Sequence, residues 1–224
     1  MNKKVLIISP HADDEILGCG GFISKYSKKN YYISVLILTN ASKGAPELYT
    51  ATDIIKLRNE AKNANKFVGT NKLFFENFPA IILNNYPSYK ISLTINKYLL
   101  SLKPEIVLIP SANDIHDDHK VIFNAAKVSL RPNNFNNIKK ILSYEVPSET
   151  EWNENGNSFN PNYFVRLTKS DIDKKVKAFL KYKSQVKKMP HPRSKEGIIN
   201  LSKFRGAQSY IQYAEAYRVE RMLD

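Results

Sequence analysis

Two short clusters of histidine and acidic residues could do chemistry in this sequence. The first, His11-Ala12-Asp13-Asp14-Glu15, comes shortly after the apolar run Val5–Ile8. The second, Asp114–His119, comes shortly after the apolar run Ile106–Pro110, and together the clusters hold three of the chain's four histidines. Imidazole and carboxylate ligands with one open position are typical of catalytic zinc sites, whereas structural sites are closed and usually contain thiolates. The residue types therefore predict a catalytic metal site, and a chain whose only thiol is Cys19 has no thiolate cage.

The position of the clusters supports this interpretation. Short, fully apolar runs are typical of buried strands, and open α/β sheets bind their ligands at the carboxyl ends of parallel strands. Adjacent acids at such a strand end repel one another unless a cation or a proton relieves them. We therefore expect the acids of the first cluster to lie beside a metal ion.

The spacing within the clusters suggests a role for four residues. His11 and Asp14 are three residues apart, so that a tight loop brings both to one ion, and His119 completes the ligand set. A hydrolytic site also needs a base for the attacking water. Asp13 neighbours a ligand while pointing elsewhere, and we expect it to take that proton and pass it to the leaving group. Two imidazoles and a carboxylate suit Fe²⁺ as well as Zn²⁺.

The two clusters also resemble the paired motifs of the PIG-L/LmbE-like zinc N-deacetylases, H-P-D-D-E and H-x-D-H. Ala12 stands where that family usually has proline. Weaker similarity lies in Leu17–Gly21, in Arg58-Asn59-Glu60-Ala61 with Val68-Gly69, and in the tail Tyr213–Tyr217.

The resemblance implies the same ligands, His11, Asp14 and His119, and the same base, Asp13. It further implies that His116 stabilises the tetrahedral oxyanion and that Asp118 holds the ring of His116 in its productive orientation. Arg58 and Glu15 become the substrate-binding candidates. Two alternatives stay open: Arg58 pairs locally with Glu60, and Glu15 supports the ligands or accepts hydrogen bonds from backbone amides where the next helix starts.

The apolar periods alternate between strand-like and helix-like segments, which predicts βαβ units and a mainly parallel sheet. We expect a single domain over residues 1–224 with a Rossmann-like, three-layer α/β/α fold. The expected strands are Lys3–Ser9, Tyr31–Thr39, Lys72–Phe75, Glu105–Pro110, Ile138–Glu145 and Tyr163–Thr168. The expected helices are Glu15–Lys29, Thr52–Val68, Tyr89–Leu102, His119–Leu130, Ser170–Val186 and a final one over Leu201–Tyr217. Pro147–Pro161 and Met189–Pro192 are expected loops, and whether they close over substrate stays open.

Composition limits the class of protein and its partners. The chain has 224 residues, of which 42% are hydrophobic and 25% charged, values that are ordinary for a globular protein. With no long apolar run and a single cysteine, we expect a cytoplasmic protein, with the cytosolic membrane face as the alternative. The net charge of +13 has two interpretations. One is a lysine-rich, solvated surface. The other is attraction to an anionic substrate or to anionic lipid headgroups, which would give peripheral membrane association. No nucleic-acid-binding motif is present, and the oligomeric state stays open.

These observations lead to one expected activity and two alternatives. We expect a zinc-dependent hydrolase that removes the N-acetyl group from an N-acetylglucosamine-type conjugate, such as a glycan, glycolipid or nucleotide-sugar precursor, and releases acetate. One alternative is a zinc amidase for a non-sugar amide. The other is a non-catalytic, basic binding protein that keeps a metal for structure alone.

Overall fold

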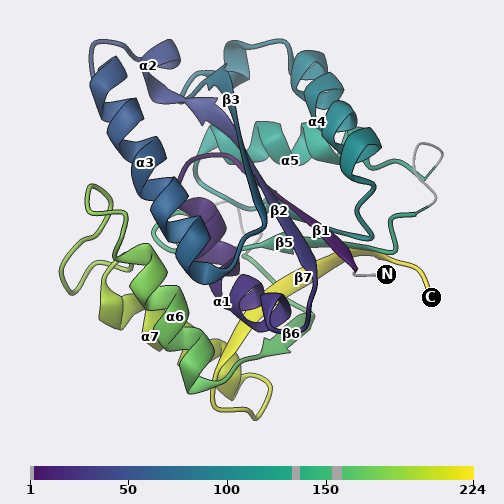
Figure 1. Ribbon diagram of the computed structural model, residues 1–224, viewed down its shortest axis with the longest axis vertical. Coiled ribbons are helices and arrows are strands. Elements are labelled where there is room, and N and C mark those ends of the chain that lie inside the picture. Colours follow the sequence, from purple (N-terminus) through teal and green to yellow (C-terminus); the bar gives the residue numbers. More distant parts are fainter. Residues whose placement is uncertain (1–2, 133–136, 153–157) are drawn as a thin grey trace.

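One mixed sheet organises the fold (Figure 1). The computed structural model describes residues 3–132, 137–152 and 158–224, and over these ranges seven strands pair in the order β3-β2-β1-β4-β5-β7-β6. The strands are β1 (Lys4–Ser9), β2 (Tyr32–Asn40), β3 (Lys72–Pro79), β4 (Ile106–Pro110), β5 (Lys140–Tyr144), β6 (Tyr163–Arg166) and β7 (Ala214–Met222).

The topology places the ends of β1 and β4 side by side. β1 to β5 are all parallel, and Ile7 of β1 lies opposite Val35 of β2 on one side and Leu108 of β4 on the other. The chain leaves β1 for β2 and β3, and then crosses to β4 on the opposite side of β1. Such a reversal of strand order is where open α/β sheets bind ligands. The two His/Asp clusters follow these two strands and therefore meet.

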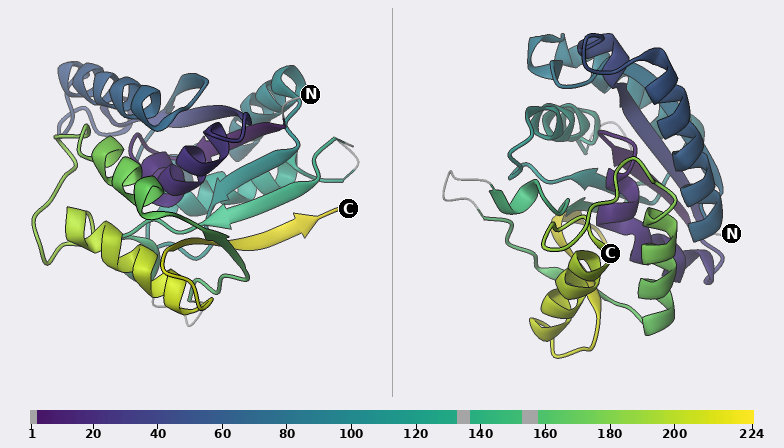
Figure 2. Two further views of the ribbon diagram at one scale, coloured as in Figure 1. Left: turned by 60° about the horizontal axis from the view of Figure 1, so that its bottom comes forward. Right: turned by 90° about the vertical axis from the view of Figure 1, so that its left-hand side faces the viewer.

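Helices cover both faces of the sheet (Figures 1 and 2). One face packs against α1 (Asp14–Ser27), α3 (Ala51–Val68), α6 (Lys169–Phe179) and α7 (Lys195–Ala207), and the other against α4 (Ser88–Leu102) and α5 (Asp117–Ser129). Shorter helical segments are α2 (Ala41–Gly44), η1 (Leu83–Asn85) and η2 (Thr150–Trp152).

The apolar residues of the strands divide between these two layers. Val5 and Ile7 of β1 belong to the core under α1, whereas Leu6 and Ile8 belong to the core under α4 and α5. Successive side chains of a strand point to opposite faces, so an unbroken apolar run buries both. The expected three-layer α/β/α fold is confirmed.

Two expected helices are wrong in extent or kind. The helix expected over Ser170–Val186 ends at Phe179. The helix expected over Leu201–Tyr217 is instead α7, which ends at Ala207, followed by β7. Alanine and glutamate in Ala214–Tyr217 favour a helix by propensity, but this segment pairs in antiparallel register with β6, and the rest of β7 from Tyr217 onward pairs with β5. Tertiary pairing therefore outweighs local propensity.

The remaining observations concern membrane-spanning helices and the expected loop after β5. Within the described part of the chain, no helix is both long enough and apolar enough to cross a bilayer. Of the expected loop Pro147–Pro161, residues 153–157 lie outside the described residues, and Trp152 ends the short helix η2.

Candidate active site

The first cluster forms a tight turn between β1 and α1. Asp13 has a φ of 129°, a region that residues other than glycine rarely adopt and that costs about 1–3 kcal/mol. The buried carboxylate of Glu15 accepts the backbone N–H of Asp13 at 3.0 Å. Glu15 is itself held by the side chains of Asn65 and Tyr182. These contacts hold the strained turn and thereby place Asp13 and Asp14.

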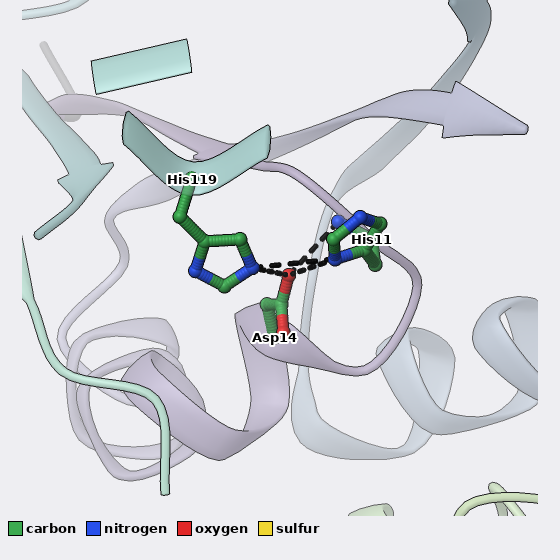
Figure 3. Close-up of side chains that lie close together, drawn as sticks. All are labelled: His11, Asp14 and His119. Carbon is green, nitrogen blue, oxygen red and sulfur yellow. Dashed lines mark hydrogen bonds and ion pairs between the residues drawn. The ribbon is translucent and has the colours of Figure 1, made fainter. Parts of the chain in front are cut away.

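Three side chains converge on one point at the carboxyl ends of β1 and β4 (Figure 3). Oδ2 of Asp14 lies 3.4 Å from Nδ1 of His11 and 3.2 Å from Nε2 of His119. The two ring nitrogens are themselves 3.2 Å apart. Tetrahedral ligands about 2.0–2.1 Å from a zinc ion lie about 3.3–3.4 Å from one another. The three atoms therefore have the spacing of three corners of a tetrahedral metal site.

Two carboxylates fix the rings of the histidines. Oδ2 of Asp114 lies 3.1 Å from Nδ1 of His119, and Oδ2 of Asp118 lies 3.0 Å from Nε2 of His11. When each carboxylate accepts a ring N–H, Nε2 of His119 and Nδ1 of His11 keep their lone pairs for the shared point. Carboxylate partners of this kind are a regular feature of histidines that bind metals.

The charges of the cluster also suit a cation. Burial lowers the pKa of His11, but hydrogen bonds with Asp118 and Asp14 outweigh burial and raise it to about 9. Burial raises the pKa of Asp14, but His119 and His11 outweigh it and hold this pKa well below its usual range. The second oxygen of Asp14, Oδ1, is buried and has no hydrogen-bond partner. The donor set thus fits a divalent cation, which would replace the protons that the carboxylates otherwise draw onto the imidazoles.

One cavity of about 170 Å³ opens beside this cluster. Its polar lining combines groups from both clusters with groups from elsewhere in the chain: His11, Asp13, Thr39, Asn40, Arg58, His116, Glu149, Gln185 and Arg193. Its apolar lining includes Ile37, Ile54, Leu57, Phe75 and Ile81. The predicted base and the predicted oxyanion-stabilising histidine therefore face the same space as the ligand His11.

His116 has a different partner from the one expected. Its Nδ1 accepts the backbone N–H of Asp118 at 3.2 Å, while the carboxylate of Asp118 bonds to His11. The expectation that the Asp118 carboxylate orients the ring of His116 is therefore wrong, because the start of α5 turns this side chain toward the β1 loop. Burial and the neighbouring imidazoles lower the pKa of His116 to about 4. A neutral ring whose Nδ1 already accepts a hydrogen bond has Nε2–H left to donate.

The two substrate-binding candidates differ in position. Arg58 lines the cavity, donates to the backbone oxygen of Glu76 and lies over the ring of Phe75. It has no bond with Glu60, whose carboxylate accepts Oγ–H of Ser184 at 2.6 Å. Glu15, in contrast, is fully buried away from the cavity lining. Its role there is to accept the backbone N–H of Asp13, one of the two alternatives considered from the sequence.

Three residues of the site were not predicted from the sequence. Asp114, which fixes the ring of His119, belongs to the second cluster. Its nearness in sequence to His116 and His119 could have identified it as a partner of a metal-binding histidine. Glu149 and Arg193 lie in segments without a recognisable motif, after β5 and before α7. Over the described ranges, the other groupings of potential metal ligands are His11-His116-Asp118 and Asp114-His119-Glu149. Both share a histidine with the main cluster, so they belong to the same site.

Comparison with known proteins identifies the class of protein to which this fold and site belong. Residues 6–130 match the family described as PIG-L, GlcNAc-PI de-N-acetylase. The chain belongs to this family, which confirms the resemblance seen in its motifs.

Three relatives extend the match. The uncharacterized deacetylase YaiS of Escherichia coli (strain K12) is 29% identical over 81% of this chain and 91% of its own. The diacetylchitobiose deacetylase of Thermococcus kodakarensis is 26% identical over 96% of this chain and 82% of its own. The solved N,N'-diacetylchitobiose deacetylase from Pyrococcus horikoshii superposes with a TM-score of 0.77 at 23% identity, covering 97% of this chain and 83% of its own. This last likeness supports the fold.

Proposed function

We propose that the chain is a zinc-dependent hydrolase that cleaves the acetamide of an N-acetylglucosamine-type amino sugar and releases acetate and the free amine. One observation carries the proposal. A three-residue ligand set with tetrahedral spacing adjoins a cavity that Asp13 and His116 also face. A purely structural metal site has no use for a base and a hydrogen-bond donor on an open side, which argues against the non-catalytic alternative.

The metal would be held by Nδ1 of His11, Oδ2 of Asp14 and Nε2 of His119. When bound there, a divalent ion supplies Lewis acidity, which polarises the amide carbonyl and lowers the pKa of a water molecule. Zinc is the proposed ion, and the same ligands accept Fe²⁺.

The chain's own groups then move the protons. Burial raises the pKa of Asp13 well above its usual range, although Arg193 opposes this shift. A carboxylate with a raised pKa is a stronger base, suited to taking a proton from the attacking water and returning it to the amine nitrogen. Nε2–H of His116 donates to the carbonyl oxygen as negative charge develops on it.

The proposed substrate is an amino-sugar conjugate, of which anionic or lipid-linked forms fit best. In the described residues, no carboxylate forms an ion pair with Arg58, so its guanidinium at the cavity is available for a hydroxyl or an anionic group. The net charge of +13 also favours anionic conjugates. The relative described as a diacetylchitobiose deacetylase and the family description, GlcNAc-PI de-N-acetylase, support an amino-sugar substrate.

The test pairs metal analysis of the purified protein with an acetate-release assay. Free, phosphorylated, nucleotide-linked and lipid-linked N-acetylglucosamine are compared for the wild type and for Asp13→Ala, with Asp117→Ala as a control on the exposed side of α5. We expect about one zinc per chain, acetate from at least one conjugate, and loss of activity in Asp13→Ala alone. Bound metal without acetate from any conjugate supports the non-sugar amidase instead. Failure to bind added zinc contradicts the whole assignment.

A further inference from the structure

Arg193 reaches the site from the segment between α6 and α7. Its side chain is only 14% exposed and lines the cavity. The guanidinium donates from Nη1 to Oδ2 of Asp13 at 3.1 Å and from Nε to Oγ of Ser148 at 2.8 Å. A third bond runs from Nη2 to Oε1 of Glu149. One rigid, planar group thus fixes the predicted base and a second carboxylate together.

The carboxylate of Glu149 lies between Arg193 and a predicted metal ligand. Its other oxygen, Oε2, is buried without a hydrogen-bond partner and lies 3.2 Å from Nε2 of His119, a predicted metal-binding nitrogen. Asp13 immediately precedes another ligand, Asp14. Glu149 is therefore close enough to compete for the metal's open position, and Asp13 lines the same cavity as the ligand His11. Carboxylate oxygen is a good ligand for zinc.

We propose that Arg193 is a positioning residue for deacetylation: it holds Asp13 in place to act as the base and keeps Asp13 and Glu149 from binding the metal. This inference rests on the proposed function, because it takes Asp13 to be the base. Charge-assisted bonds from a guanidinium are directional. They fix where a carboxylate points as well as compensating its charge. Without Arg193, the two carboxylates would be free to turn toward the cation, and either one would fill the position that substrate and water need.

The chain contains a matched control. Arg205 of α7 donates from Nε and Nη2 to both oxygens of Glu145, just after β5, at 2.8 and 2.5 Å. This pair is also mostly buried and joins the same two parts of the chain as Arg193 and Glu149. Neither Arg205 nor Glu145 lines the cavity beside the metal ligands. Loss of either arginine removes an ion pair between these segments, but only Arg193 touches Asp13.

The experiment compares wild type, Arg193→Ala and Arg205→Ala after circular dichroism has shown that each is folded. We expect Arg193→Ala to lower kcat about 100-fold, the cost of misplacing a catalytic group by about 1 Å, with KM changed less than about threefold. Added guanidinium ion, well below denaturing concentrations, should restore part of kcat in this variant alone. Equal losses in both arginine variants, or a change confined to KM, would overturn the proposal.

A second readout does not depend on turnover. Each protein is loaded with Co²⁺, whose visible absorption weakens when a tetrahedral site gains a further ligand. We expect weaker absorption in Arg193→Ala than in the wild type and in Arg205→Ala, and recovery of the wild-type spectrum in the triple variant Arg193→Ala/Asp13→Ala/Glu149→Ala. A spectrum of Arg193→Ala identical to that of the wild type overturns the proposal. If the wild type releases no acetate from any substrate, the proposed function fails, while the spectra still show whether Arg193 restrains the two carboxylates.

Discussion

Oδ2 of Asp118 lies 3.0 Å from Nε2 of His11, across 107 residues of sequence. The same carboxylate accepts the backbone N–H groups of Ile81 and Leu83 at 2.6 and 3.1 Å. Ile81 lines the cavity with a φ of 63°. Asp118 therefore connects a predicted metal ligand to the segment after β3 that forms one wall of the cavity.

Asp118→Asn should weaken zinc binding about 10- to 100-fold, the usual cost of losing the carboxylate behind a metal-binding histidine. The amide has nearly the same shape but no longer favours the protonated Nε2 that leaves Nδ1 of His11 free for the metal. Competition with a chromophoric chelator measures the affinity. Asp117→Asn is the control, because Asp117 is exposed and pairs with Lys120. Equal affinities in the two variants would show that Asp118 does not orient His11.

Arg58→Ala should lower kcat/KM about 10- to 100-fold, mainly through KM, because the side chain lines the cavity without touching the ligand set. Arg58→Lys should recover little, since a point charge cannot donate to Glu76 and Asn77 while also facing a substrate. Kinetics on a neutral and a phosphorylated conjugate measure both effects. Lys56→Ala on the exposed side of α3 should leave both constants unchanged. An identical loss on both conjugates would argue against an anionic group at Arg58.

Removal of the metal should destabilise the fold. A ligand that binds the native state alone, present at 100 times its Kd, stabilises that state by about 2.7 kcal/mol. Calorimetry should therefore show a higher Tm in zinc than in chelator, and His119→Ala should abolish the difference. The zinc effect should also shrink as pH falls, because protons compete with zinc for His11, His119 and Asp14. A zinc-induced rise in Tm that persists in His119→Ala would place the metal elsewhere.

The sequence predicts those parts of the site whose residues directly follow a recognisable strand. His11 to Asp14 and His119 follow apolar runs, so strand ends and ligand types were both visible in the sequence. The contact between the Asp118 carboxylate and His11 could not be predicted, because it depends on how the start of α5 faces the β1 loop. Arg193 and Glu149 were missed for a related reason: their role comes from tertiary contact between two irregular segments. The expected helix Leu201–Tyr217 includes the first four residues of β7, because Ala214–Tyr217 favours a helix by local propensity, whereas strand pairing decides its structure.

A last prediction concerns stability away from the site. Asp171 belongs to the capping box of α6. It also accepts hydrogen bonds from Ser24, which lies in α1, and from Lys28, the C-cap of α1. Burial raises the pKa of Asp171, but the bonds from Lys28 and Thr168 outweigh it and hold the pKa at about 2, below the usual 3.8. Between these values the unfolded chain binds more protons than the native protein. The stabilisation is therefore complete above about pH 4 and is lost as pH falls toward 2.

Asp171→Asn should therefore lower the free energy of unfolding by about 1 kcal/mol at pH 7, a typical net value for the loss of a hydrogen bond. The difference from the wild type should shrink to near zero at about pH 2. Urea denaturation at a series of pH values measures it, and the subtraction removes the titration of the active-site acids. Asp173→Asn is the control, because Asp173 forms an exposed ion pair with Lys169 on the same helix and such pairs contribute little. If the difference for Asp171→Asn does not change between pH 5 and pH 2, the contacts of Asp171 do not depend on its charge.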